Sequence, residues 1–175
     1  QDIWELAEVG YMETESTEML QGMLREAGFE MASGVAGMPT AFVASWGGGG
    51  PVIGIMGEFD ALPGINQSRS GERDPIPGKI AGHACGHHLF GTGSVAAAIA
   101  VKDWLERTGQ PGTIRVYGTP AEEGGAGKVY MVRAGLMNDV DAMLHWHASS
   151  ENSASASSSL ANKSGKFRFY GQSAH

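Results

Sequence analysis

The stretch Pro51-Val-Ile-Gly-Ile-Met-Gly-Glu-Phe-Asp60 decides the expected fold of this chain. Positions 52–56 form a continuous apolar run, whereas a strand with one face in water alternates apolar and polar residues. Such a run is typical of a strand that is covered on both faces. The strand delivers Glu58 and Asp60 to its carboxyl end. We therefore expect an α/β fold with two carboxylates at one edge of a sheet.

Strands and helices alternate on either side of this stretch. Helical spacing over 2–28, interrupted at Gly10 and Tyr11 and ended by Gly28, predicts two amphipathic helices. The other predicted elements are strands at 40–46, 112–119, 141–146 and 167–170, a polar loop at 66–80, and helices at 86–107 and 126–134. Residues 149–164, rich in serine and alanine, are interpreted as an edge strand or a linker. The order strand–helix–strand–helix–strand indicates an α/β sandwich.

Composition is that of an ordinary globular protein and excludes several function classes. The chain has 175 residues, enough for a domain with a core, and 42% of them are hydrophobic. A net charge of −7 argues against nucleic acid as a partner and offers no basic face to a membrane. No apolar run reaches the roughly 18 residues of a membrane span. The single cysteine excludes an internal disulfide and favours a reducing compartment, the cytoplasm.

Side chains of metal-ligating type surround that cysteine. Residues 82–88 read Gly-His-Ala-Cys-Gly-His-His, so Cys85 lies between His83 and His87, with His88 next in the chain. Together with carboxylates downstream, these groups form a ligand set for a zinc-like or manganese-like ion. Cys85 and His87 would diverge on a helix, so we expect a loop or helix N-terminus where both turn to one metal. His83 and His88 are candidates for orienting a ligand.

Further acidic and histidine side chains follow the ends of predicted strands. A two-metal hydrolase needs one carboxylate on metal and another to move a proton, and Glu122 and Glu123 can divide these roles. His145 and His147 point to opposite faces of an extended segment, so we assign His147 to the site and His145 to packing or to orienting a ligand. Asp60 can orient a histidine, bind metal or cap a turn. Ligands bind beyond the carboxyl ends of strands in open α/β sheets, so these groups can converge.

Three other interpretations of these residues stay open. Cys85 can be a buried structural thiol beside solvent-facing histidines. It can also be a nucleophile activated by a nearby histidine, which leaves Glu122 and Glu123 without a role. The chain can, finally, bind metal or a partner subunit without hydrolysing anything. A metal-dependent amide hydrolase uses all of these groups, and we favour it.

Taken together, four motifs resemble the M20 family of metallopeptidases, in its amidohydrolase branch. They are Gly57-Glu-Phe-Asp-Ala-Leu-Pro-Gly64, Gly82-His-Ala-Cys-Gly-His87, Pro120-Ala-Glu-Glu-Gly-Gly125 and Trp146-His147. Two features mark one particular member of that branch. Gly-Glu-Phe-Asp at 57–60 stands where Ala-Asp-Met-Asp is usual, and Lys128 ends a glycine-rich segment. The resemblance covers nearly the whole chain.

The fold that the resemblance implies is a three-layer sandwich like that of zinc peptidases, with a mixed, largely parallel sheet. In this family a smaller lid and dimerisation domain interrupts the catalytic domain. The resemblance assigns residues 1–164 to the N-terminal part of the catalytic domain and 165–175 to the start of the lid, most of which is absent. It also implies a homo- or heterodimer formed through that lid.

The site that the resemblance implies holds two divalent ions, zinc or manganese. The implied metal ligands are a bridging Cys85 together with His87, Glu123 and His147. Glu122 would be the general base. His175, at the end of a Gly-x-x-Ala-His motif, would reach a partner subunit's site and help to hold the substrate carbonyl oxygen. The implied substrate is a small N-acyl amino acid, with aroyl-glutamates included.

Three departures from the family pattern bear on this interpretation. His88 stands where Asp or Asn is usual, so the group that orients the neighbouring ligand differs, and Ala148 replaces a frequent proline. The family's last metal ligand is a histidine far downstream of the lid, and the sequence does not include it. We therefore expect a truncated chain, starting abruptly at Gln1, that does not turn over substrate on its own.

Overall fold

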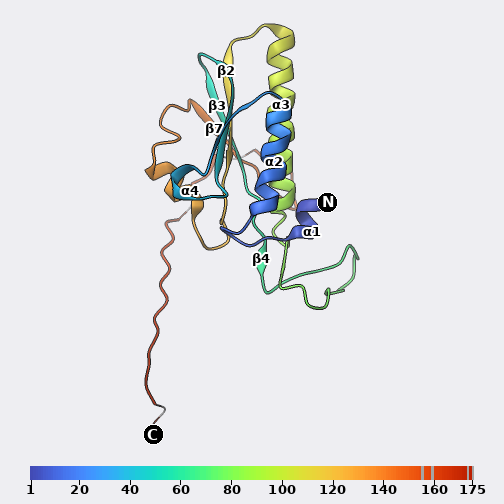
Figure 1. Ribbon diagram of the computed structural model, residues 1–175, viewed down its shortest axis with the longest axis vertical. Helices are drawn as coiled ribbons and strands as arrows, with labels where there is room; N and C mark the ends of the chain where they lie inside the picture. The colour runs from blue at the N-terminus through green and yellow to red at the C-terminus, as the bar shows by residue number, and fades with distance from the viewer. Residues whose placement is uncertain (155, 159, 173, 175) are drawn as a thin grey trace.

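A five-stranded sheet lies between a layer of long helices and a layer made of a short helix and loops (Figure 1). The structure is a computed structural model that describes residues 1–154, 156–158, 160–172 and 174. Helices α2 (Thr14–Glu26) and α3 (His87–Thr108) cover one face of the sheet, and α4 (Gly127–Arg133) lies against the other. Beyond the last strand the chain runs away from the body of the fold as an extended segment (Figure 1).

The central sheet is mixed, as expected. In spatial order its strands are β1 (Glu30–Ser33), β2 (Phe42–Gly48), β6 (Gly112–Gly118), β3 (Val52–Gly57) and β7 (Ala142–Leu144). Strand β3 is parallel to both of its neighbours, with Ile55 opposite Val116 in β6 and Leu144 in β7. Strand β2 is antiparallel to both β1 and β6, so the pairs divide evenly between the two kinds. Because β3 lies between two other strands and under α3, its sequence is apolar at successive positions.

The face under α2 and α3 holds the larger hydrophobic core. Val95 and Ala98 of α3 and Leu24 of α2 are completely buried against the sheet. Glycines let α3 lie very close to β3, because a Cβ added to Gly57 would be only 3.3 Å from the Cα of Gly91. This close approach puts the beginning of α3 directly beside the carboxyl end of β3.

The opposite face is closed by α4, by the short 3₁₀ helix η1 (Val35–Gly37) and by the loop that follows α4. Met131 of α4 and Tyr117 of β6 are completely buried there. The Tyr117 hydroxyl donates a hydrogen bond of 2.8 Å to the carbonyl of Leu136 in that loop. Both faces of the sheet are therefore covered, and the three-layer α/β sandwich predicted from the sequence is confirmed.

Helix α1 (Asp2–Leu6) and a two-stranded sheet complete the fold at the end where β3 finishes. Strands β4 (Leu62–Pro63) and β5 (Ala81–Gly82) are antiparallel and bring the two ends of the predicted polar loop together. The helices in the part of the chain that the structure describes include none long and apolar enough to cross a membrane.

Most predicted elements match the structure to within two residues at each end. The break between the first two helices is also confirmed, since α1 ends at Leu6 and α2 begins at Thr14. Strand β1 was not predicted, because three of its four residues are exposed and its sequence shows no apolar alternation. The strand predicted at 167–170 is wrong: the segment has no strand partner, and Phe169 is 93% exposed. The described residues of 149–164 form no strand either, which favours the linker interpretation.

Candidate metal centre

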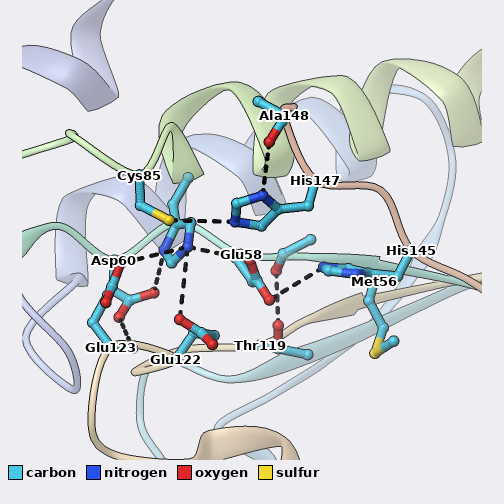
Figure 2. A network of polar contacts seen from close by, with 12 residues as sticks. Met56, Glu58, Asp60, Cys85, Thr119, Glu122, Glu123, His145, His147 and Ala148 are labelled. Carbon is cyan, nitrogen blue, oxygen red and sulfur yellow. Dashed lines mark hydrogen bonds and ion pairs between the residues drawn. The ribbon is translucent and has the colours of Figure 1, made fainter. Parts of the chain in front are cut away.

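The parallel strands β3, β6 and β7 end at the same edge of the sheet, and the sequence-predicted site residues lie there (Figure 2). Glu58 and Asp60 follow β3, Glu122 and Glu123 follow β6, and the histidine pair follows β7. The first turn of α3 supplies a further histidine, and Cys85 precedes that helix. This convergence is the one expected beyond the carboxyl ends of strands in an α/β sheet.

His87 is the centre of this arrangement. It is the first residue of α3, and the preceding Gly86 has φ of 86°, a left-handed conformation that favours glycine. The ring is completely buried, and its Nδ1 lies 2.9 Å from Oδ1 of Asp60. Of the three roles that the sequence left open for Asp60, this contact favours orientation of the His87 ring.

The other ring nitrogen of His87 faces a ring of carboxylates. Its Nε2 lies 3.3 Å from Glu58 Oε2, 3.8 Å from Glu122 Oε2 and 3.9 Å from Glu123 Oε1. None of these contacts has hydrogen-bond geometry, so the buried Nε2 has no hydrogen-bond partner among the described residues. Buried polar atoms are nearly always paired. A histidine fixed by a carboxylate through one nitrogen and free at the other is typical of metal ligation.

Cys85 and His147 complete the group. Cys85 Sγ lies 3.3 Å from Nε2 of His147, and Figure 2 shows these two side chains pointing toward each other. The ligating atoms of Cys85, His87 and His147 lie within 4.8 Å of one another, and so do those of His87, Glu122 and Glu123. The five side chains thus form two sets of potential ligands that share His87. Thiolate, imidazole and carboxylate are a donor set that fits zinc, and the residues present therefore fit a divalent metal.

The turn that carries Glu122 and Glu123 is held from outside the predicted site. Ala121 has φ of 55°, which is strained for a residue with a Cβ. Its N–H donates a 2.8 Å hydrogen bond to the buried carboxylate of Glu13, and the N–H of Glu123 donates to Asp60 Oδ2 at 2.9 Å. Sequence analysis did not identify Glu13, because a glutamate ahead of a helix has no pattern that points to a turn more than a hundred residues later.

His145 also takes part in the network, through Glu58. Its Nε2 lies 3.1 Å from Glu58 Oε1, and the ammonium of Lys128 contacts the same oxygen. Between the two histidines, Trp146 packs edge-on against Phe90 with ring centroids 4.8 Å apart. The prediction that His147 contacts the site directly agrees with this geometry, and His145 contacts a neighbour of the site instead.

His83 and His88 contact each other, and His83 also contacts helix α1. Their rings are 5.0 Å apart, and His83 Nε2 lies 3.0 Å from the carbonyl of Ile3. His83 lines a cavity of about 560 Å³ between α1 and the loop 64–84. One polar side chain of that cavity ties the loop to α1: Lys79 donates to the carbonyl of Glu5 at 2.9 Å. We assign no ligand to the cavity, and neither histidine contacts the potential ligands.

The electrostatics of the centre favour a bound cation. Burial and the neighbouring carboxylate of Glu123 raise the pKa of Cys85 to about 11. A thiol in this environment needs a nearby positive charge to become a thiolate. Burial alone would raise the pKa of Glu58, but the hydrogen bond from His145 and the charge of Lys128 outweigh it and lower the pKa to about 2. Burial and the charge of His88 lower the pKa of His83 to about 4.

Comparison with known proteins identifies the family. Residues 54–160 match the sequence model of the family described as Peptidase family M20/M25/M40. The chain belongs to this family. The match includes all five potential metal ligands, the strands β6 and β7, and all of β3 except its first two residues.

Two M20 relatives illustrate the similarity. The chain is 48% identical to one of the subunits of p-aminobenzoyl-glutamate hydrolase from Escherichia coli, over 99% of its own length and 36% of that protein. The similarity to this member of the family, which the Gly-Glu-Phe-Asp and lysine segments indicated, is thereby confirmed. The structure resembles that of a dinuclear metal-binding M20 peptidase from Bacillus subtilis, with a TM-score of 0.68 and 30% identity. That alignment covers 81% of this chain and 39% of the neighbour.

The share of each relative that is covered matters for function. Mouse Xaa-Arg dipeptidase is 34% identical over 79% of this chain, but only 30% of the dipeptidase is aligned. The chain thus spans about a third of the length of the curated relatives it matches. His175, proposed from the family motif as a substrate-binding residue, lies outside the described residues. The division at residue 164 between catalytic domain and lid stays a prediction.

Proposed function

We propose that this M20 family chain is the metal-binding part of an amide hydrolase that acts on N-acyl amino acids such as p-aminobenzoyl-glutamate. The observation that carries the proposal is the pair of potential ligand sets that share the buried His87, whose Nε2 has no hydrogen-bond partner among the residues that the structure describes. The similarity to p-aminobenzoyl-glutamate hydrolase of Escherichia coli supports this choice of substrate.

Four side chains would hold two divalent ions, zinc or manganese: Cys85, His87, Glu123 and His147. Bound ions would supply Lewis-acid activation of water and of the amide carbonyl. Asp60 keeps the imidazole of His87 in the orientation that ligation needs, from 2.9 Å away. Its second oxygen accepts the N–H of Glu123 and so fixes the start of the acidic turn relative to His87.

Glu122 would be the general base. Its side chain is 45% exposed, whereas Glu123 is 20% exposed, so Glu122 is the member of the pair that substrate can approach. From its place beside His87, the Glu122 carboxylate would take a proton from the attacking water and deliver it to the leaving amine. Glu123, the more buried of the two, suits the role of ligand.

The rest of the active protein is also part of the proposal. Residues 1–164 would form the N-terminal part of the catalytic domain and 165–175 the start of a lid and dimerisation domain. A further metal-ligating histidine would follow the lid in sequence, and His175 would hold the substrate carbonyl in a partner subunit's site. The Escherichia coli relative is named as one subunit of its hydrolase, which favours a dimer with a like or unlike chain.

A cysteine-nucleophile mechanism is the alternative that the contact between Cys85 and His147 brings up. A nucleophilic cysteine normally lies in positive surroundings that lower its pKa. Here burial and Glu123 raise the pKa of Cys85 to about 11, so the free thiol is a poor nucleophile at neutral pH. This environment favours a metal ligand, whose proton is displaced by the bound cation. The other alternative, a chain that binds metal but hydrolyses nothing, is separated from the proposed hydrolase by an activity assay.

Metal content per folded chain tests the proposal first. Elemental mass spectrometry of the wild-type chain and of Cys85→Ser should find about one to two equivalents of zinc or manganese in the former and a marked loss in the latter. In the full-length protein, Glu122→Gln should abolish release of p-aminobenzoate while metal content stays at the wild-type value. Normal turnover by Glu122→Gln would refute its role as base. Metal uptake without hydrolysis of any N-acyl amino acid would favour the non-catalytic alternative.

A further inference from the structure

Glu58 is a buried carboxylate that lies beside the potential metal ligands and has no role in the proposed mechanism. Its side chain is 3% exposed, and its Oε2 lies 3.3 Å from Nε2 of His87 without hydrogen-bond geometry. Figure 2 shows Glu58 between His145 and the acidic groups of the site. A buried charge at the edge of a metal centre must be compensated or it will act on the centre.

The compensation comes from the other layer of the sandwich. Lys128 lies in the first turn of α4, and its ammonium contacts Oε1 of Glu58, while His145 lies 3.1 Å from the same oxygen. The Glu58 backbone has no room to move away on the opposite side, because a Cβ added to Gly91 of α3 would be 2.8 Å from the Glu58 carbonyl oxygen. Glu58 is therefore held between α3 and α4, with one oxygen fixed by cationic or polar donors.

Lys128 also brings the charge of the centre into balance. The carboxylates of Glu58, Asp60, Glu122 and Glu123, together with a metal-bound thiolate at Cys85, carry five negative charges when the histidines are neutral. The ammonium of Lys128 reduces this total to four, which equals the charge of two divalent ions. Charges this close act on one another, most strongly at Glu58 and Asp60, because these two carboxylates are buried and water screens them little.

We propose that Lys128 is a positioning residue of the metal centre: it holds Glu58 beside His87 and offsets the charge of that carboxylate, so that Glu58 stays out of the coordination shell. This inference rests on the proposed function, since it concerns the same two ions. Removal of Glu58 alone leaves an unpaired ammonium that repels the ions. Removal of both side chains restores the balance.

Co²⁺ binding to the full-length protein tests this role, because the visible spectrum of bound Co²⁺ reports its coordination and titration gives its dissociation constant. Glu58→Gln should weaken Co²⁺ binding about tenfold or more. This is the size of effect expected when one member of a buried pair of opposite charges is removed. The double variant Glu58→Gln/Lys128→Met should bind Co²⁺ with an affinity within about threefold of wild type. Such a recovery, when the second side chain is also removed, is typical of two side chains in contact. Lys128→Arg, which keeps the positive charge, should bind like wild type. Melting temperatures confirm that each variant is folded.

Asp139→Asn is the matched control. It leaves Arg115 unpaired in the same way, since the two form an ion pair of 2.6 Å, but at a site outside the metal centre. Its Co²⁺ affinity should equal that of wild type. A folded double variant that binds Co²⁺ no better than Glu58→Gln would overturn the inference, because the two side chains would then act by packing alone. Glu58→Gln/Lys128→Gln gives the same comparison if the methionine variant unfolds. The comparison is made in the full-length protein, and a full-length wild type that binds no Co²⁺ would instead count against the proposed function.

Discussion

Replacement of Asp60 by asparagine isolates the contribution of the carboxylate that orients His87. The side chain is completely buried, and its oxygens accept from His87 Nδ1 and from the Glu123 N–H, both at 2.9 Å. In D60N the carbonyl oxygen can serve only one of these donors, and the amide group faces the other. A lost hydrogen bond to a charged group costs about 1.5–3 kcal/mol, and a buried donor left unpaired costs a similar amount. Both figures describe the loss of the same contact and are counted once, so we expect D60N to lower the free energy of unfolding by about 1.5–3 kcal/mol.

Urea denaturation of the metal-free chain, followed by circular dichroism, measures this change. The control is Asp139→Asn, because Asp139 is 64% exposed and its pair with Arg115 should contribute about 1 kcal/mol or less. In metal titrations D60N should also weaken binding by about 10- to 100-fold, since the orientation of a ligating histidine is lost. A loss below 1 kcal/mol together with unchanged metal affinity would refute the orienting role of Asp60.

Two further predictions concern stability. Because burial and the charge of His88 lower the pKa of His83 to about 4, the native state favours neutral His83. The contribution of neutral His83 to the free energy of unfolding is complete above about pH 6.5, the pKa of histidine in the unfolded chain. It is lost as the pH falls toward 4, by up to about 3 kcal/mol. Urea denaturation at pH 7.5 and 4.5 should find a smaller acid loss in His83→Gln than in wild type, and equal losses would contradict this prediction. Gly118→Ala should destabilise the chain by about 1–3 kcal/mol, because its Cβ would overlap the ring of Phe42. Gly22→Ala in α2, where nothing lies within 4 Å, should instead be neutral or stabilise by up to about 1 kcal/mol, and equal melting temperatures of the two variants would show that the overlap has no cost.

Much of the fold could be predicted because it depends on local patterns. The apolar run at 52–56 indicated a strand covered on both faces, and β3 does lie between β6 and β7 with helices on each side of the sheet. Two elements could not be predicted this way. Strand β1 forms only because β2 offers a free edge, and residues 167–170 alternate like a strand but have no partner. Strand formation needs hydrogen bonds to a second segment, which no local pattern guarantees.

The candidate ligands could be named from the sequence, since residue type, position at the ends of predicted elements and the family motifs together pointed to Cys85, His87, Glu122, Glu123 and His147. The tertiary structure decided which groups act on one another. It brought Asp60 to His87, and it brought Lys128 of α4 across the sheet edge to Glu58, seventy positions away in the chain. Glu13 likewise holds the turn at Ala121 from a distance of more than a hundred residues. Such contacts arise from how layers pack, because side chains remote in sequence become neighbours only when the sheet and both helical layers are assembled.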